Sequence, residues 1–357
     1  MRAVALGGGH GLHATLSALR RLTDDITAVV VVADDGGSSG RIRRELDILP
    51  LGDLRMALGA LSGQEHPGPE TTVWQRVFEH RYGGHGALAG HAVGNLVLAG
   101  LLEVLDDPVA ALDQACHLLG VTGRVLPMSP HPVDIEADVT GIRGSSGSDH
   151  DRDVAHRIRG QVAVATTPGR VQQVRLDPRR PKACPEACEA LRAADVITLG
   201  PGSWFSSVLP HLLVPELFSA LVESEARRVL VLNLAPQPGE TAGFSPEQHL
   251  EVLAAHAPRL RLDVVVADTA AVPEPDLLRR GAEAFGADTL LTTVGAADGS
   301  PQHDPDALAS ALAEAAHHRV EGPSGGPATN GTDAHGGVAV PGADPARPHQ
   351  EEDRRWP

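Results

Sequence analysis

The densest group of chemically useful residues follows an apolar run at Val29 to Val32. Two acids come first, and glycines and hydroxyls follow them directly in the sequence DDGGSSG. Carboxylate oxygens are ligands that Mg²⁺ accepts, and glycines let a ligand approach the main chain closely. The other interpretation is a strand-to-helix turn with two capping acids, but so many glycines are costly in a mere turn, and we favour a ligand site. The expected site residues are Asp34, Asp35, Gly36, Gly37, Ser38 and Ser39, with Asp34 and Asp35 as candidate Mg²⁺ ligands.

Two further turns combine a short buried strand, glycines and the start of a helix. One follows a strand predicted at 2–6 and the other follows a strand predicted at 195–199. Backbone N–H groups at helix N-termini bind phosphate, so both are candidate phosphate-binding turns. The alternatives are a tight turn packed under the sheet and, for the serine, a helix cap. The residues concerned are Gly7, Gly8, Gly9, His10 and Gly11 in the first turn and Gly200, Gly202 and Ser203 in the second.

The first turn does not match the dinucleotide fingerprint. The pattern G-x-G-x-x-G would place its last glycine at position 12, which is Leu12. A dinucleotide-dependent dehydrogenase is therefore disfavoured.

Other polar residues occupy helix starts and strand ends. Asp53 is placed as an N-cap, and Arg55, one turn into that helix, faces either an anionic ligand or solvent. His91 and Asn95 lie four residues apart and so share a helical face. The pair Glu240 and Thr241 follows a strand predicted at 228–234. We include Arg55, His91, Asn95, Glu240 and Thr241 in the expected ligand-binding set, although no nucleophile–base pair stands out.

Apolar strands alternate with amphipathic helices along most of the chain. This pattern predicts an α/β fold, Rossmann-like, with a mostly parallel sheet and helices on both faces. We expect an exposed excursion at 141–159, and strands broken by Pro and Gly at 124–140 and 161–176. We expect one domain at 1–319 and a disordered, acidic, Gly/Pro-rich tail at 320–357, because the tail has almost no large apolar residue.

The composition limits the classes of partner. The chain has 357 residues and a formal net charge of −16, which argues against nucleic-acid binding. Its three cysteines do not suggest a disulfide framework. No apolar run approaches the ~20 residues of a membrane span, and the first residues look like a strand and not a signal peptide. We therefore expect a cytoplasmic protein with no membrane span, and we expect it to form a homo-oligomer.

Taken together, several motifs resemble the CofD-like superfamily, and within it the YvcK family of gluconeogenesis factors. They appear in the order GGGHG (7–11), ADDGGSSGRIR (33–43), GDLR (52–55), HAVGNL (91–96), AADVITLGPGSWFSSVLPHLL (193–213) and NLAPQPGET (233–241). The resemblance covers about residues 2–318.

The resemblance implies a ligand crevice above the strand ends of a Rossmann-like fold. One branch, the 2-phospho-L-lactate transferases, moves a phospholactyl group from a guanylyl donor to the deazaflavin Fo and releases GMP. The other branch, which this chain resembles more, binds UDP-sugars such as UDP-N-acetylglucosamine and is needed for cell shape and gluconeogenic growth. By this resemblance the 7–11 turn would face phosphates, and Asp34 and Asp35 would contact sugar, nucleoside or Mg²⁺. Both a UDP-sugar-binding regulator and a transferase stay open at this point.

Overall fold

The computed structural model describes residues 1–62, 69–142 and 154–317, with the backbone alone at 69–72. A parallel sheet of seven strands forms its centre, in the order β10-β9-β8-β7-β1-β2-β3. Its strands are β1 (Ala3–Gly7), β2 (Ile26–Val30), β3 (Arg124–Pro127), β7 (Val196–Leu199), β8 (Arg227–Val231), β9 (Val264–Asp268) and β10 (Asp288–Thr292). The α/β, Rossmann-like fold expected from the sequence is confirmed.

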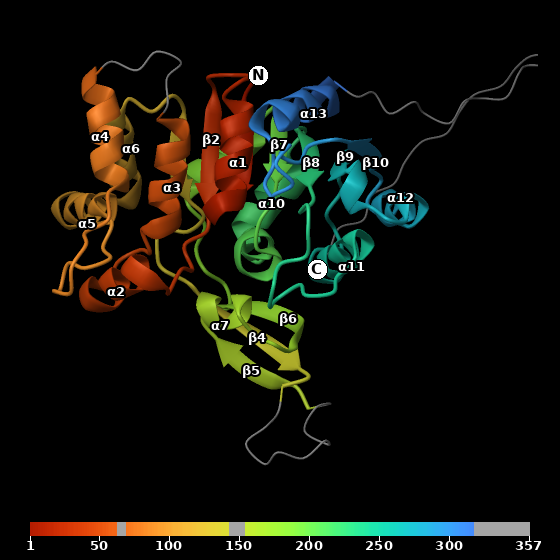
Figure 1. Ribbon diagram of the computed structural model, residues 1–357, viewed down its shortest axis with the longest axis horizontal. Coiled ribbons are helices and arrows are strands. Elements are labelled where there is room, and N and C mark those ends of the chain that lie inside the picture. The colour runs from red at the N-terminus through yellow and green to blue at the C-terminus, as the bar shows by residue number, and fades with distance from the viewer. Residues whose placement is uncertain (63–68, 143–153, 318–357) are drawn as a thin grey trace, which may run out of the picture. The chain divides into compact units, whose positions relative to one another are not determined.

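Helices cover both faces of this sheet (Figure 1). Helices α1 and α13 pack against each other on one face, and α8 and α10 pack against each other on the opposite face. The helices are α1 (Gly9–Leu19), α2 (Gly37–Leu46), α3 (Gly52–Leu61), α4 (Pro69–Glu79), α5 (Val93–Leu105), α6 (Pro108–Leu119), α7 (Gln161–Ala165), α8 (Pro185–Ala193), α9 (Leu209–Leu212), α10 (Pro215–Glu223), α11 (Pro246–His256), α12 (Pro275–Glu283) and α13 (Pro305–His317). A π-helical turn, Trp204–Val208, follows β7, and a 3₁₀ turn, Thr269–Ala271, follows β9.

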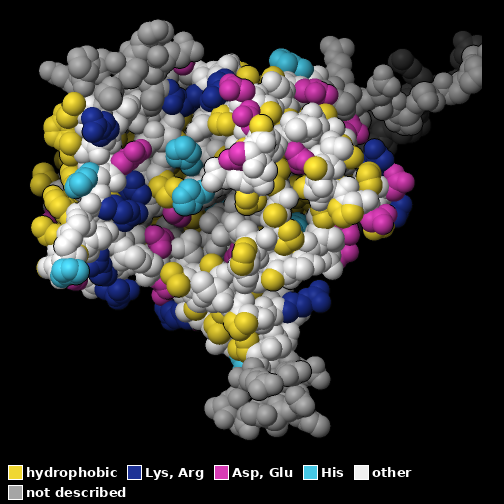
Figure 2. Space-filling view, in the orientation of Figure 1, with side chains coloured by type: hydrophobic (Ala, Val, Ile, Leu, Met, Phe, Trp, Pro, Cys, Tyr) yellow, Lys and Arg dark blue, Asp and Glu magenta, His cyan; other side chains and the backbone are white. Residues whose placement is uncertain are grey.

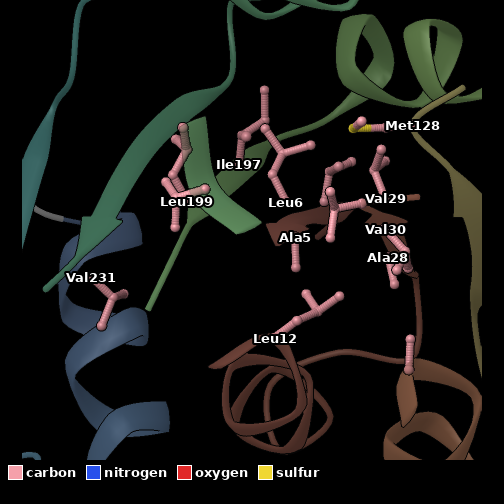
Figure 3. Packing of buried hydrophobic residues seen from close by; sticks show 14 of the residues in the cluster. Ala5, Leu6, Leu12, Ala28, Val29, Val30, Met128, Ile197, Leu199 and Val231 are labelled. Atoms are coloured by element: carbon pink, nitrogen blue, oxygen red, sulfur yellow. The ribbon is translucent and has the colours of Figure 1, made fainter. Parts of the chain in front are cut away.

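The core forms on the two faces of the central strands. In Figure 3, Ala5 of β1 points toward Leu12 of α1 on one face, while Leu6 and Ile197 point to the other face. Every residue of β1 is buried. Burying a Val or Leu side chain, such as those of β1, stabilises the fold by roughly 1.5–3 kcal/mol. The strands therefore form a rigid support for the loops at their carboxyl ends.

The apolar run after β2 is buried but is only partly strand. The paired strand ends at Val30, earlier than the run at 29–32 suggests, and Val31 instead donates its N–H to Gly7 O. Val31, Val32 and Ala33 are fully buried. Burial of the run was therefore predicted correctly, and the strand boundary was wrong because pairing and burial end at different residues.

A second, antiparallel sheet contains part of the strands expected at 124–140 and 161–176. Strands β5 (His156–Arg159), β4 (Asp134–Thr140) and β6 (Arg170–Asp177) form it, and it lies toward the carboxyl ends of the parallel strands (Figure 1). Side chains of β4 alternate between buried and half-buried, as expected for a sheet with one solvated face. The range 124–140 therefore holds two strands of different sheets, and 161–165 is the helix α7.

The expected excursion at 141–159 is also wrong in part, because residues 156–159 pair with β4. Arg157 and Arg175 flank Asp138 across the three strands, with an Arg157 Nε–Asp138 Oδ1 distance of 3.0 Å. Residues 143–153 and the expected tail at 320–357 lie outside the described residues.

No single helix among the described residues has both the length and the apolar character that a membrane crossing requires. One helix pair, Trp204–Leu212 and Pro215–Glu223, meets that requirement only when joined across a bend of 74°.

Candidate functional site

Two glycine turns meet where the strand order of the sheet reverses. From β1 the chain builds the sheet outward through β2 and β3, and from β7 it builds outward through β8, β9 and β10. A Cβ on Gly11 would lie 2.0 Å from the carbonyl oxygen of Pro201 and 2.6 Å from Cα of Gly202, so only glycine lets the turns touch. Open α/β sheets bind ligands outside the strand ends at such a reversal point. The structure thus brings the 7–11 and 200–203 turns together.

The second turn is held in place from both sides. Asn233, just after β8, accepts a hydrogen bond from Gly202 N at 2.8 Å and donates one to Gly202 O at 2.9 Å. Thr15 of α1 donates its hydroxyl to Gly200 O at 2.9 Å. Asn233 was not among the expected site residues. The available signal was an amide near the end of a predicted strand, inside a motif already recognised.

Asp53 lies against the first turn and is a second residue that the expected set omitted. A Cβ on Gly8 would lie 2.7 Å from Asp53 Oδ2, and Gly9 N donates to this carboxylate. Asp53 is not the N-cap of α3, because Leu51 occupies that position. Burial raises the pKa of Asp53 to about 7, and the charge of Asp34 adds to the rise. Its Oδ2 is buried and has no hydrogen-bond partner among the described residues.

Asp34 approaches the same place from the end of β2. Its Oδ1 accepts a hydrogen bond from Gly36 N at 2.9 Å, and a Cβ on Gly52, the first residue of α3, would lie 2.8 Å from its Oδ2. Burial raises the pKa of Asp34 as well, with Asp35 contributing to the rise. Asp34 and Asp53 thus form a pair of partly desolvated carboxylates beside the first glycine turn. Two such carboxylates suit a hydrated Mg²⁺, which protein sites commonly hold with one or two carboxylates.

Asp35, the second expected metal ligand, points elsewhere. Its Oδ1 accepts a hydrogen bond from Val162 N in the first turn of α7 at 2.9 Å. A Cβ on Gly160, the N-cap of α7, would lie 2.2 Å from Asp35 Oδ2. The structure therefore places Asp35 against the N-terminus of α7 and Asp34 beside Asp53. Within the described part of the chain, no group of three or more His, Cys, Asp or Glu side chains is arranged to hold a metal.

The hydroxyls of the 34–39 loop are engaged by neighbouring helices. Ser38 Oγ lies 3.0 Å from His91 Nδ1 and accepts from Asn95 Nδ2 at 3.1 Å. Ser39 Oγ accepts from Gly52 N at 3.1 Å. All of these side chains but the glycine are buried. His91 and Asn95 therefore hold the loop in position, and Gly37, with a φ of +48°, stands exposed at its outer edge.

Glu240 is placed behind the second turn. It is 2% exposed, and its carboxylate faces the N–H groups of Trp204 and Phe205 and the hydroxyls of Ser203 and Ser206. Burial raises the pKa of Glu240 to about 7, although these donors oppose the rise. Neither carboxylate oxygen reaches hydrogen-bond geometry with a described residue. Thr241 is also buried, and its hydroxyl accepts from Gln237 N at 2.8 Å.

Two cavities are lined by residues of the loop between β8 and α11, which contains Glu240 and Thr241. One of about 310 Å³ begins at Asn233 and includes Phe244 and His249 in its lining. The other, of about 210 Å³, includes Glu240 and Arg170. The larger cavity adjoins the Asn233 contact with the second turn, and its size suits a small flat group attached to a phosphate bound at the turns.

His10 lies in α1 and Arg55 lies in α3. His10, in the first turn of α1, is exposed. The other side chains of the expected set are half-buried or buried. Arg55 is only 8% exposed, and the charges that act on it most belong to Arg81, Glu79 and Asp53. The expected site residues thus fall into four groups: those at the two turns, those in the 34–39 loop or holding it, Glu240 with Thr241 behind the second turn, and Arg55 on α3.

Comparison with known proteins gives consistent matches. A family model described as 2-phospho-L-lactate transferase CofD matches residues 3–295. A Mycobacterium tuberculosis protein named "Putative gluconeogenesis factor" is 56% identical over 312 residues, which are 87% of this chain and 88% of that protein. The "Gluconeogenesis factor" of Listeria monocytogenes is 32% identical, covering 87% of this chain and 94% of that protein.

A solved structure agrees with these sequence matches. The crystal structure of a member of the UPF0052 family from Bacillus halodurans is similar with a TM-score of 0.75 and 32% identity, covering 88% of this chain and 98% of that one. The seven-stranded parallel sheet, the paired glycine turns and these matches lead to one conclusion: the chain belongs to the CofD family, and its relatives include proteins named gluconeogenesis factors.

Proposed function

We propose that this chain is a cytoplasmic, nucleotide-sugar-binding regulatory protein that acts in cell-shape control and gluconeogenic growth. The observation that carries the proposal is the contact between the two glycine turns, at Gly11 and Gly202, at the reversal point of the sheet. Together the turns supply main-chain N–H groups for a diphosphate. The names of the relatives support the regulatory role.

The ligand would extend along the sheet edge in both directions from the turns. Its nucleoside would occupy the cavity beside Asn233 and His249, and its sugar would lie toward Asp34 and Asp53. These two carboxylates would hold Mg²⁺ against the diphosphate, where the cation would neutralise phosphate charge. Phosphate recognition by main-chain N–H groups and Mg²⁺ is compatible with the strongly negative net charge of the chain.

A second candidate function is phospholactyl transfer, which the CofD family description and the Asp34–Asp53 pair both favour. A flat deazaflavin acceptor would need aromatic or broad apolar surface for stacking. Trp204 and Phe205, the aromatic residues nearest the second turn, are completely buried beneath it. This burial supports the binding function over the transfer function.

The deciding experiment compares the two functions on one protein preparation. Calorimetry with UDP-N-acetylglucosamine and Mg²⁺ should give saturable binding. Mixing the protein with Mg²⁺, Fo and the guanylyl phospholactate donor should release no GMP above a protein-free control. Steady GMP release would replace the proposed function with transfer, and absence of binding by any UDP-sugar to folded protein would refute the nucleotide-sugar assignment.

A further inference from the structure

Helix α7 spans the mouth of the candidate site. In the parallel sheet, β7 and β1, which lead into the two glycine turns, lie between β8 and β2. The N-terminus of α7 contacts the loop after β2, where Val162 N donates to Asp35 Oδ1 at 2.9 Å. Its C-terminus contacts the loop after β8, where a Cβ on Gly239 would lie 2.2 Å from Ala165 O. Because α7 contacts the loops on both sides, it crosses the two turns between them.

The packing of α7 places it directly on the site. It packs against the π-helical turn Trp204–Val208, which follows the second glycine turn, and Val164 is completely buried. A Cβ on Gly36 would lie 2.8 Å from Cγ2 of Val162, so α7 rests on the 34–39 loop. Figure 1 shows α7 beyond the carboxyl ends of the parallel strands. A ligand that approaches the turns from this side therefore meets α7 first.

The outer side of α7 faces solvent. Val162 is 47% exposed and Ala163 is exposed as well. Figure 2 shows hydrophobic side chains on the surface where the antiparallel sheet meets the rest of the domain. The helix can therefore move outward without displacing another element that the structure describes.

The attachment of α7 is small and local. The helix has five residues, whereas an isolated helix needs about 12–15 to be even marginally stable in water, so its contacts with the loops hold it in place. Gly160, which precedes it, has a φ of +103°, a conformation open to glycine that suits a hinge. Directly after the helix, Pro168 and Gly169 line the cavity of about 210 Å³ that they share with Glu240. An element held by few contacts beside unfilled space opens at a low free-energy cost.

We propose that α7 is a gate over the glycine turns, held closed by the Asp35–Val162 hydrogen bond, and that the nucleotide sugar enters and leaves when this contact opens. The inference rests on the proposed function and adds the control of access to the same site. Asp35 acts on α7 and not on the ligand, because both of its carboxylate oxygens face the start of this helix. Lids of this kind commonly set the rates at which ligands exchange.

The gate has a kinetic signature. It is closed in the free protein, and the ligand lies beneath it, so closure slows association and dissociation by the same factor. The ratio of the two rate constants, which is the Kd, then does not depend on how firmly the gate is held. A residue that contacts the ligand would instead change the Kd.

Loss of the helix cap tests the gate. Asp35→Ala should shift the opening of α7 roughly fivefold, about 1 kcal/mol, as for other helix caps. In stopped-flow experiments with UDP-N-acetylglucosamine and Mg²⁺, both rate constants should rise about fivefold while the Kd stays within threefold. Asp107→Ala is the matched control, because Asp107 caps α6 in the same way, accepting from Val109 N at 2.8 Å. Its rate constants should not change.

A reversible lock tests the gate in the opposite direction. The close approach of Gly36 to Val162 puts the double variant Gly36→Cys, Val162→Cys within reach of a disulfide, whose Cβ atoms lie ~3.5–4.5 Å apart. The three native cysteines are buried. Oxidation of this variant should lower both rate constants at least tenfold relative to the reduced form of the same protein, and reduction should restore them.

The outcomes separate the gate from the function on which it rests. Absence of UDP-sugar binding by the folded, unaltered protein would refute the proposed function itself. Binding with equal rate constants in the oxidised and reduced double variant would overturn the gate alone, and so would a tenfold weaker Kd in Asp35→Ala. If Asp35→Ala fails to fold, the double variant decides. Failure of its two cysteines to join on oxidation would show that α7 does not rest on the 34–39 loop, and would also overturn the gate.

Discussion

At the scale of single residues, the three acids near the first turn have different surroundings. Asp34 and Asp53 share a desolvated place beside Gly8 and Gly52, whereas Asp35 caps α7. Replacing Asp34 or Asp53 by Asn should therefore weaken Mg²⁺-dependent UDP-sugar binding at least tenfold, about 1.4 kcal/mol. Calorimetry with and without Mg²⁺ measures this loss.

Asp35→Ala is the matched comparison. Loss of its hydrogen bond to Val162 N should lower the free energy of unfolding by about 1 kcal/mol, as for other helix caps, with ligand affinity changed less than threefold. Chemical denaturation measures the first quantity. If Asp35→Ala abolishes binding and Asp53→Asn does not, the assignment of the pair is wrong.

Glu240 should make stability depend on pH. Its pKa in the folded protein is about 7, against 4.5 for an ordinary Glu, so the native state retains a proton that the unfolded state has lost between these pH values. Raising the pH from 4.5 to 7 should therefore lower the free energy of unfolding of the unaltered protein. The variant Glu240→Gln has no such group and should not show this loss. The free energy of unfolding of Glu240→Gln, minus that of the unaltered protein, should rise across this range by on the order of 3 kcal/mol.

Comparing the two proteins at each pH removes the contributions that they share. Buried histidines such as His211, whose pKa burial lowers to about 4, act in both. Thermal or denaturant unfolding at half-unit pH steps gives the difference. A difference that stays constant from pH 4.5 to 8 would mean that Glu240 has the same pKa in the folded protein as in the unfolded chain.

The sequence predicted residue types at the site better than their directions. The glycine turns at 7–11 and 200–203 could be predicted because each follows a short apolar strand. The different orientations of Asp34 and Asp35 could not be predicted, because side chains beyond the end of a strand no longer follow a fixed periodicity. The burial of Arg55 depends on packing between α1, α3 and α4, which no local pattern reveals.

At the scale of elements, the contact between the glycine turns is the most sensitive point. Gly11→Ala would place a methyl group 2.0 Å from the oxygen of Pro201, a backbone atom that cannot move away easily. We expect UDP-sugar binding to be lost and the free energy of unfolding to fall by roughly 1–3 kcal/mol, as for other overpacked sites. Calorimetry and denaturation measure both effects.

Gly100→Ala is the matched control for Gly11→Ala. Gly100 lies in α5, and nothing stands within 4 Å of the Cβ it would gain. An exposed Gly to Ala change inside a helix should stabilise the protein by roughly 0.5–1 kcal/mol and leave binding unchanged. Normal binding by Gly11→Ala would show that the close approach of the turns is not needed for the ligand.

The strands of the antiparallel sheet were predicted from the sequence only in part. Residues 134–140 read as a strand, but their sheet could not be assigned, because partners in an antiparallel sheet come from distant segments. The apolar segment at 161–165 was read as strand and is helical, because Asp35 provides a cap that lies 127 residues away. A cap from so far along the chain leaves no local signal.

At the scale of the whole molecule, the family model ends at residue 295 and the last described helix ends at His317. A chain truncated after Arg319 should therefore keep its melting temperature within a few degrees and its UDP-sugar affinity unchanged. The composition of 320–357 supports this expectation, because few large apolar residues are available to bury. Differential scanning calorimetry compares the two chains, and a much lower melting temperature would mean that the removed residues stabilise the domain.

The pairing of β1 with β7 has a consequence for synthesis on the ribosome. Arg2 bonds to Asp195 across 193 residues, and β1 pairs with β7 right beside this bond. At a synthesis rate of roughly 5–20 residues per second, the apolar edge of β1 waits about ten seconds or more for its second neighbour. During that interval β1, β2 and the first glycine turn exist without the second turn. The nascent chain thus carries an open sheet edge, the kind of surface that chaperones cover and that aggregates when they are absent.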